Sequence, residues 1–198
     1  MGLAKARPRT ETLDMRLAKR LAAARAARGQ TLDELAQASG VSRAMISKIE
    51  RGESSPTAMV LGKLAGGLGV SLSSLFAEVE GKVEPVARFE RQPLWRDPET
   101  GYRRRDVAPP GTGSPQDIVR VELPPGARVA YPASTYAHRD HLVLLLSGRL
   151  RFGNGARVFD LEAGDCLRLP EVADSWYFNP GPDPAEYLVL IVRLPGFG

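Results

Sequence analysis

Polar and basic side chains between positions 43 and 48 form the pattern in this 198-residue sequence that is best suited to chemistry. Arg43, Ala44, Ser47 and Lys48 fall on the outward side of a predicted helix that Ser42 can cap. Arginine and lysine donate hydrogen bonds to the acceptor edges of bases in the major groove of DNA, and a helix of this size fits that groove. The pattern therefore predicts a DNA-reading helix.

Two short helices joined by a glycine turn would position these side chains. Thr31 and Glu34 form a capping-box pattern at the start of the first helix, and Gly40 stands where a left-handed residue ends it. Apolar residues at helical spacing predict the buried side of each helix. These residues are Leu32, Leu35 and Ala36 in the first helix and Met45, Ile46 and Ile49 in the second.

This helix pair resembles the helix-turn-helix of the phage-repressor-like, xenobiotic-response-element class of bacterial regulators. The likeness runs from about Leu13 to Phe76 and includes the run ISKIERGESSP. It implies that the second helix meets base edges or the nearby backbone, with Arg43 bidentate to guanine. Phosphate contacts are implied at a helix N-terminus and at a basic side chain. The implied DNA-binding residues are Thr31, Ser42, Arg43, Ala44, Ser47, Lys48 and Arg51.

Three more helices are expected around this pair. Ser55 is placed to cap the fourth helix, with Pro56 as its first helical residue. Gly66 and Gly67 lie inside that helix, where each costs about 1 kcal/mol relative to alanine, so we expect its last turn to be loose. The additional helices are Thr12–Arg28, the one from Pro56 to Leu68, and Ser71–Phe76.

Charge and cysteine content restrict the setting of the protein. Residues 1–80 hold twelve basic against eight acidic side chains, whereas the remainder holds fifteen of each. The excess positive charge therefore lies with the predicted DNA reader, as phosphate binding requires. Cys166 is the single cysteine, which suits a reducing cytoplasm, and its apolar surroundings predict a core thiol. No apolar run suits a signal peptide or a membrane span, so we expect a cytoplasmic protein without a membrane partner.

Beyond Glu80 the helical periodicity gives way to short alternating runs and frequent turns. This pattern predicts an all-β sandwich or barrel, with a turn at 95–101. Leu142–Leu146 and Leu188–Val192 are apolar throughout, which predicts strands covered on both faces. The predicted strands are Val83–Phe89, Tyr102–Val107, Ile118–Leu123, Arg128–Tyr131, His141–Leu146, Arg149–Phe152, Ala156–Leu161, Cys166–Leu169, Trp176–Asn179 and Tyr187–Leu194.

The runs HRDHLVLLLSGRLRFGNG and LEAGDCLRLPEVADSWYFNP resemble the two motifs of a cupin barrel. A repressor-like helix-turn-helix followed by a cupin is similar to a bacterial regulator family, and the likeness covers nearly the whole chain. It implies a multidomain α and β fold, in which a five-helix domain precedes an all-β jelly-roll (double-stranded β-helix) barrel. The expected divisions are a basic arm (1–11), the helix-turn-helix domain (12–79), a linker with first strands (80–117) and the cupin barrel (118–198).

Metal-binding cupins gather two or three histidines and a carboxylate inside the barrel. The resemblance places His141 at or next to a ligand position and puts Ser175 where the histidine of the second motif would stand. Only His138, Asp140 and His141 remain as weak metal candidates, and neighbouring strand residues point to opposite faces. We therefore expect no metal and no other cofactor.

A cupin cavity suits a small molecule, with a few polar groups among apolar walls. Arg149 and Arg151 share a strand face that could bind an acidic effector, although a solvated face is the interpretation we favour. The candidate effector-binding residues are Tyr136, His138, His141, Ser175 and Tyr177, with Trp176 beside them.

These patterns predict a sequence-specific DNA-binding transcription regulator rather than an enzyme. One reading helix contacts only half of an operator, so we expect a homodimer on a palindromic operator of double-stranded DNA. The β domain would hold the two subunits together. A ligand in the barrel would shift the spacing of the two reading helices. Two alternatives stay open: a metal-dependent cupin enzyme fused to a DNA-binding module, and a structural cupin that only holds the dimer.

Overall fold

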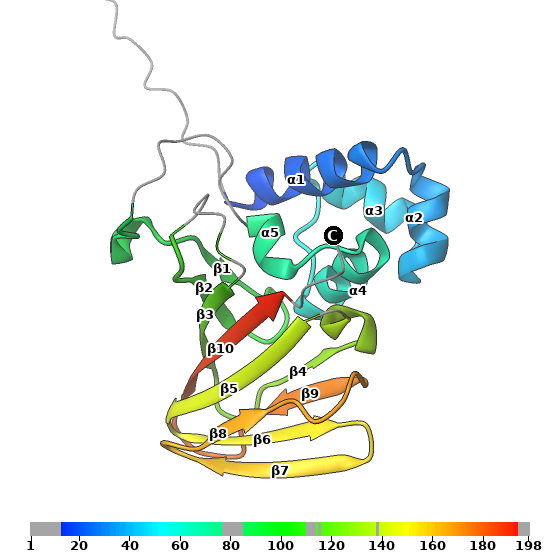
Figure 1. Ribbon diagram of the computed structural model, residues 1–198. Coiled ribbons are helices and arrows are strands. Elements are labelled where there is room, and N and C mark those ends of the chain that lie inside the picture. Colours follow the sequence, from blue (N-terminus) through cyan, green and yellow to red (C-terminus); the bar gives the residue numbers. More distant parts are fainter. Residues whose placement is uncertain (1–12, 77–84, 110–113, 115, 138, 194–198) are drawn as a thin grey trace, which may run out of the picture.

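The computed structural model describes residues 13–76, 85–109, 114, 116–137 and 139–193. Figure 1 shows the helices gathered at one end of the molecule and the strands at the other. In this part of the chain none of the helices is both long and apolar enough to span a membrane. The helices are α1 (Leu13–Ala27), α2 (Leu32–Ser39), α3 (Arg43–Glu50), α4 (Ala58–Leu68) and α5 (Leu72–Phe76).

Local capping signals decide where α2 and α3 begin and end. Thr31 Oγ1 accepts from Glu34 N at 3.2 Å, and Thr31 N donates to Glu34 Oε2 at 2.7 Å, so the predicted capping box is confirmed. Gly40 ends α2 at φ 66°, and Ser42 caps α3 by accepting from Met45 N. These caps set the turn that joins the two helices.

The start of α4 differs from the prediction. Thr57, not Ser55, is the N-cap, because its hydroxyl accepts from Val60 N at 3.3 Å. The Ser55 hydroxyl instead donates to Asp14 Oδ2 at 2.7 Å, and Pro56 lies outside the helix as a buried residue. A free hydroxyl two residues further along provided the better cap.

A single apolar core holds the helices together. Leu17, Leu35, Ile46 and Ile49 are each at most 1% exposed. The prediction that Met45 belongs to the buried stripe is wrong, since its side chain is 39% exposed. Ile46 and Ile49, three residues apart, already fill the narrow face that so short a helix offers to its neighbours.

The strands form two antiparallel sheets. The six-stranded sheet has the order β1-β2-β3-β10-β5-β8, and the four-stranded sheet has the order β4-β9-β6-β7. Strands that are neighbours in a sheet are mostly not consecutive in the sequence, because the chain crosses repeatedly between two facing sheets, as in a jelly roll. The strands are β1 (Leu94–Arg96), β2 (Arg103–Asp106), β3 (Gln116–Leu123), β4 (Arg128–Tyr131), β5 (Arg139–Ser147), β6 (Arg149–Asn154), β7 (Arg157–Glu162), β8 (Cys166–Arg168), β9 (Ser175–Phe178) and β10 (Ala185–Arg193).

The segment before β2 departs from the sequence-based expectation. A strand was expected over Val83–Phe89; positions 83 and 84 lie outside the described residues, the next four form no strand, and Phe89–Arg91 is a 3-10 turn. Trp95, expected in a turn, lies in β1 and is 3% exposed. Its ring packs 5.9 Å from Phe76 and 6.1 Å from Tyr102, which outweighs the turn-forming residues that follow it.

The two sheets pack around a second part of the core. Val143, Leu145 and Phe152 are fully buried between them, and the rings of Tyr177 and Tyr187 stack at 5.5 Å. These residues alternate with outward-facing positions along each strand, as the two-residue period of a strand requires.

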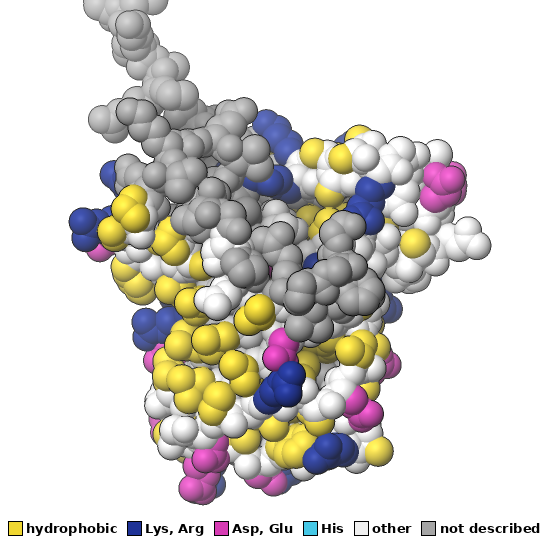
Figure 2. All heavy atoms as spheres, in the orientation of Figure 1, with side chains coloured by type: hydrophobic (Ala, Val, Ile, Leu, Met, Phe, Trp, Pro, Cys, Tyr) yellow, Lys and Arg dark blue, Asp and Glu magenta, His cyan; other side chains and the backbone are white. Residues whose placement is uncertain are grey.

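Apolar side chains also project from the outer face of the six-stranded sheet. We define the outer leucine face as Leu142 and Leu144 of β5 with Leu188 and Leu190 of β10, which lie opposite one another and are half-buried. Figure 2 shows hydrophobic side chains gathered over these two strands. The expectation that both faces are covered therefore fails within the described chain. Cys166 is exposed beside this face, so the prediction of a core thiol is wrong.

Small residues let α4 lie directly on the segment after β4 at Gly66 and on α2 at Gly67. A Cβ added at Gly66 would stand 2.3 Å from Ser134 Oγ, and one at Gly67 would stand 2.9 Å from Ser39 Cβ. The expected loosening of the last turn is not observed, because α4 remains helical to Leu68. Both glycines thus permit close approach of neighbouring backbone.

Candidate DNA-binding helix and barrel cavity

The candidate DNA-binding side chains lie on the surface of α3. Ser42, Arg43, Ala44 and Lys48 are exposed, and Ser47 is half-buried. Arg43 Nε lies 3.2 Å from Asp33 Oδ1 of α2, and the two side chains are 63% and 76% exposed. So exposed a pair is weak and leaves the guanidinium free to exchange partners.

Arg51 closes the C-terminal end of α3. Its Nε and Nη2 donate to the two carboxylate oxygens of Glu53, at 2.6 and 2.8 Å, and its Nη1 donates to the Ser47 hydroxyl. The hydrogen bonds to Glu53 raise the pKa of Arg51 and lower the pKa of Glu53. The Arg51 side chain is exposed.

Thr31 stands at the N-terminus of α2, where its hydroxyl and its backbone N–H both face Glu34. The Glu34 carboxylate accepts from the Thr31 backbone N–H and from its hydroxyl, and these bonds lower the pKa of Glu34. A phosphate at this helix end would have to share it with that carboxylate.

An ion pair that sequence reasoning did not identify holds α3 against α1. Arg25 of α1 donates from Nε and Nη2 to both carboxylate oxygens of Glu50, each at 2.8 Å, and its Nη1 donates to the carbonyl of Gln30. The bidentate geometry and the partial burial of both side chains make this one of the stronger ion pairs in the described chain. It orients the C-terminal half of α3.

The mouth of the barrel encloses a cavity of about 40 Å³ against α5. Three of the predicted effector residues, Tyr136, His141 and Tyr177, line it. Ser175 supports the cavity from behind, because its hydroxyl shares a hydrogen bond with the Tyr136 hydroxyl. His138 lies outside the described residues. The remaining lining residues are Ser71, Leu72, Tyr102, Arg104, Tyr131, Thr135, Arg139, Tyr187, Val189 and Ile191.

His141 is a buried, strongly perturbed ionisable group of the cavity. It is 4% exposed, and its ring meets that of Tyr136 edge-on at 5.0 Å. Burial, aided by the charge of Arg139, lowers the pKa of His141 to about 4, so the imidazole is neutral at pH 7. Its Nδ1 is buried with no hydrogen-bond partner among the described residues.

The residues at the metal positions do not fit a metal centre. Asp140 points away from His141 and accepts from Arg168 Nε at 3.0 Å on the outer side of the sheet. Ser175 is engaged with Tyr136. Within the described ranges no three His, Cys, Asp or Glu side chains lie close enough together to hold an ion.

Arg104 is the cavity residue that sequence reasoning missed. It is 5% exposed, and its Nη2 donates to the Ser73 hydroxyl of α5 at 2.7 Å and to Asp106 Oδ1 at 3.0 Å. Its guanidinium also lies 5.5 Å from the centre of the Phe76 ring. Burial raises the pKa of Asp106. The alternation of Arg103, Arg104 and Arg105 along a strand was the available signal, because it turns the middle one inward.

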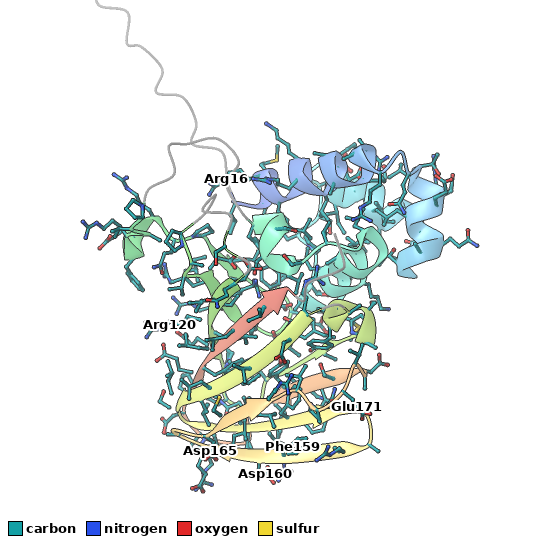
Figure 3. The ribbon with its side chains drawn as sticks, in the orientation of Figure 1. Arg16, Arg120, Phe159, Asp160, Asp165 and Glu171 are labelled. Atoms are coloured by element: carbon teal, nitrogen blue, oxygen red, sulfur yellow. The ribbon has the colours of Figure 1, made fainter. Side chains whose placement is uncertain are left out.

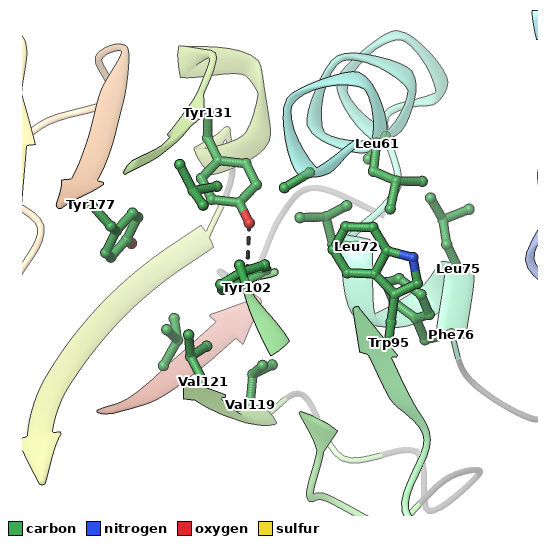
Figure 4. Packing of buried hydrophobic residues seen from close by; sticks show 14 of the residues in the cluster. Leu61, Leu72, Leu75, Phe76, Trp95, Tyr102, Val119, Val121, Tyr131 and Tyr177 are labelled. Atoms are coloured by element: carbon green, nitrogen blue, oxygen red, sulfur yellow. Dashed lines mark hydrogen bonds between the residues drawn. The ribbon is translucent and has the colours of Figure 1, made fainter. Parts of the chain in front are cut away.

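Tyrosines complete the wall beside the helices. The Tyr131 hydroxyl donates to that of Tyr102 at 3.3 Å. Figure 4 shows this pair next to the cluster of Trp95, Leu72 and Phe76. Burial raises the pKa of Tyr102 and Tyr131, so both phenols stay neutral. The cavity is thus bounded by neutral hydroxyls and by cationic guanidinium groups.

The remaining candidates from the sequence, Trp176, Arg149 and Arg151, lie away from the cavity. Trp176 packs under Arg128, with the guanidinium 4.4 Å from its ring centre. Arg151 donates to Asp160 Oδ1 at 2.6 Å, and Asp160 lies on β7, the strand furthest from the helices in Figure 3. Arg149 is exposed on β6. Neither arginine faces the cavity interior.

Comparison with known proteins identifies both parts of the chain. The family model described as helix-turn-helix matches residues 21–75, and the model described as cupin domain matches residues 119–191. The chain joins a helix-turn-helix domain to a cupin domain. The resemblances to a repressor-like helix-turn-helix and to a cupin, and the five-helix plus jelly-roll fold that they imply, are confirmed.

Relatives of this helix-turn-helix cupin protein include named regulators. The HTH-type transcriptional regulator SutR of Escherichia coli strain K12 is 39% identical over 84 residues, which are 42% of this chain and 47% of SutR. The chain thus spans about half the length of this curated relative. An HTH_3 family transcriptional regulator from Vibrio cholerae shares the fold, with a TM-score of 0.75, 24% identity and coverage of 91% of this chain and 97% of the other. Hydroxypropylphosphonic acid epoxidase from S. wedmorenis aligns with a TM-score of 0.46 and 15% identity, over 92% of this chain and 100% of the enzyme.

Proposed function

We propose that this protein is a cytoplasmic, sequence-specific DNA-binding transcription regulator. The observation that carries this proposal is the surface of α3, where the side chains of Arg43 and Lys48 are exposed while Ile46 and Ile49 hold the helix in the core. A helix presented in this way fits the major groove, with its N-terminal residues at the base edges. The regulators named among its relatives are consistent with this role.

The residues of this surface divide into two groups. We propose that Ser42, Arg43, Ala44, Ser47 and Lys48 meet base edges or the adjoining backbone, and that Arg43 reads guanine through its guanidinium fork. The proposed phosphate contacts are made by Arg51 through charge and by Thr31 at the N-terminus of α2. Both groups lie on or beside α2 and α3, which are joined by the turn at Gly40.

The direct test is operator selection from a random DNA library, followed by binding measurements on variants. Arg43→Ala should cost about 1–3 kcal/mol and relax the preference at one base pair. Arg149→Ala, which removes an exposed arginine from β6, is the matched control and should leave the preference unchanged. An intact preference in Arg43→Ala would show that the base-reading face is assigned wrongly.

We propose a homodimer on a palindromic operator, joined through the outer leucine face. This face lies on β10 and β5, two neighbouring inner strands of the six-stranded sheet, and it is flanked by the ion pairs of Arg120 with Glu186 and of Arg168 with Asp140. Figure 3 shows Arg120 projecting from the side of this sheet. An apolar centre with a charged rim is typical of protein interfaces, and a half-site reader supplies the reason for a second copy.

Light scattering after gel filtration tests the dimer. Leu144→Glu should convert it to a monomer, because the charge would be buried without a partner. Val158→Glu, at a 55% exposed position on β7 of the other sheet, is the control and should stay dimeric. A wild-type monomer at micromolar concentration contradicts this part of the proposal.

We propose that the barrel senses a small-molecule effector rather than catalysing a reaction. The support comes from residues: the positions where metal-binding cupins have ligands hold Ser175, bonded to Tyr136, and an Asp140 that faces outward. Elemental analysis of freshly purified protein tests this, since stoichiometric iron, manganese or zinc would favour the cupin enzyme instead. An operator affinity that no metabolite alters would favour the purely structural cupin.

A further inference from the structure

The cavity at the barrel mouth is shared between the two domains. Ser71 and Leu72 of α5 form one wall, and the others come from β2, β4, β5, β9, β10 and the 3-10 turn at Ala133–Tyr136. Any molecule held there touches the helix-turn-helix domain directly. The cavity is therefore placed where a bound ligand changes the contact between the domains.

The polar groups of the cavity favour a negatively charged ligand. Two guanidinium groups, of Arg104 and Arg139, line it, and the one carboxylate that pairs with Arg104, that of Asp106, lies outside the lining. Arg104 is almost fully buried, yet its Nε is buried with no hydrogen-bond partner among the described residues. A buried donor of a charged group without a partner is costly, and an anionic acceptor would remove that cost.

The size and the apolar walls restrict the rest of the ligand. Leu72, Val189 and Ile191 bring aliphatic surface to the cavity. Its 40 Å³ of free space corresponds to about three water molecules, since one occupies about 10–15 Å³ by the same measure. A dianion such as sulfate or phosphate would have to place a second charge against these apolar walls, where charge is poorly tolerated.

We propose that this cavity binds a short aliphatic monocarboxylate, with its carboxylate on Arg104 and its alkyl end against Leu72, Val189 and Ile191. This inference rests on the proposed sensing function and names the chemical class of the effector. The tyrosine hydroxyls add neutral donors around the carboxylate. The buried Nε of Arg104, which has no acceptor among the described residues, points to a small anion rather than to an ordinary packing defect.

The same contact gives the ligand a route to the reading helix. Arg104 holds the Ser73 hydroxyl of α5, and a carboxylate on Arg104 would compete with that bond. α5 packs against α1, and α1 is tied to α3 by the bidentate pair of Arg25 and Glu50. The ligand-bound and ligand-free forms would thus differ at the contact between Arg104 and α5. From there, packed contacts run through α1 to α3.

Calorimetric titration of the full-length protein tests the assignment, with propionate as the probe. Propionamide, its neutral analogue, and sulfate are titrated in parallel. We expect saturable binding of propionate alone. Arg104→Met should weaken it about 10- to 100-fold, the loss of one charge-assisted hydrogen bond, whereas Arg103→Met, on the same strand and outside the cavity, should not.

Arg104 also supports the domain contact, so a second variant keeps the test decisive if Arg104→Met does not fold. Val189→Ile adds one methylene to the cavity wall and should weaken propionate binding about 10-fold. The proposal is overturned if propionamide binds as well as propionate or if sulfate binds better. It is also overturned if propionate does not bind at a concentration 50-fold above a millimolar dissociation constant, or if Val189→Ile binds propionate as wild type does.

Operator binding, measured separately by fluorescence anisotropy, distinguishes this inference from the function on which it rests. Intact operator binding without propionate binding overturns the ligand class alone. Propionate binding that leaves operator affinity unchanged overturns the sensing function, while the carboxylate site stands. A several-fold change of operator affinity in wild type, absent in Val189→Ile at the same propionate concentration, supports both.

Discussion

Asp97 joins the two domains through a single buried carboxylate. It is 2% exposed, and its Oδ2 accepts from Ala58 N, the first residue of α4, at 2.5 Å. Its Oδ1 accepts from the backbone N–H groups of Glu99 and Thr100, both at 2.8 Å, in the turn between β1 and β2. The carboxylate thus caps the helix of one domain while it folds the turn of the other.

Replacing Asp97 by alanine should be strongly destabilising. A hydrogen bond to a charged group contributes about 1.5–3 kcal/mol, so three such bonds at the low end amount to about 4 to 5 kcal/mol. With a urea dependence of about 1–3 kcal/mol per M, the unfolding midpoint should fall by at least about 1.5 M. Asp97→Asn separates the two contributions, because the amide oxygen can keep the turn while the amide N–H₂ opposes Ala58 N.

Urea unfolding followed by circular dichroism measures these changes. Asp165→Ala is the matched control: Asp165 is exposed, and its Oδ2 accepts one backbone N–H, that of Glu162, at 2.9 Å. That variant should lose at most about 1 kcal/mol. If Asp97→Ala is no more destabilised than Asp165→Ala, the carboxylate does not join the domains energetically, and the reasoning fails.

Three further changes have defined outcomes. Gly66→Ala should destabilise by about 1–3 kcal/mol in urea because of the clash with Ser134, yet stabilise by up to about 1 kcal/mol in a Ser134→Gly background; equal effects in both would exclude the clash. The pKa of His141 in the folded protein, about 4, lies below its unfolded value of about 6.5, so the unfolded chain binds the proton more tightly. Stability relative to His141→Asn should therefore drop by about 2–3 kcal/mol from pH 7 to pH 4, and a pKa above 6 by NMR would contradict this. Arg51→Ala should reduce the slope of log K against log salt by about 0.9 while sequence preference is kept; an unchanged slope argues against a phosphate contact.

The helical part was predictable because its signals are local. The capping box of Thr31 and Glu34, the left-handed Gly40 and the Ser42 cap each depend on residues within four positions of one another. The sequence could not reveal whether Ser55 or Thr57 caps α4, since the Ser55 hydroxyl donates to Asp14, 41 positions earlier. Local patterns predict an element more reliably than its partners.

The cavity was predictable only in part, for the same reason. The cupin motifs led to Tyr136, His141 and Tyr177, which do line it. Arg104 was hidden in a run of three arginines that reads as solvated charge until the strand and its inward face are known. Cys166 shows the opposite error, because apolar neighbours along a strand do not say which face of the sheet is covered.

Buried apolar side chains continue without a break from the helices through Leu72, Phe76 and Trp95 into the barrel. Chimeras that exchange either half with that of another regulator would expose part of this shared surface on both pieces. Grafting this barrel onto a foreign DNA reader should therefore require transplanting α4 and α5 with it. The functional boundary for such protein engineering lies between α3 and α4, not at the point where helices give way to strands.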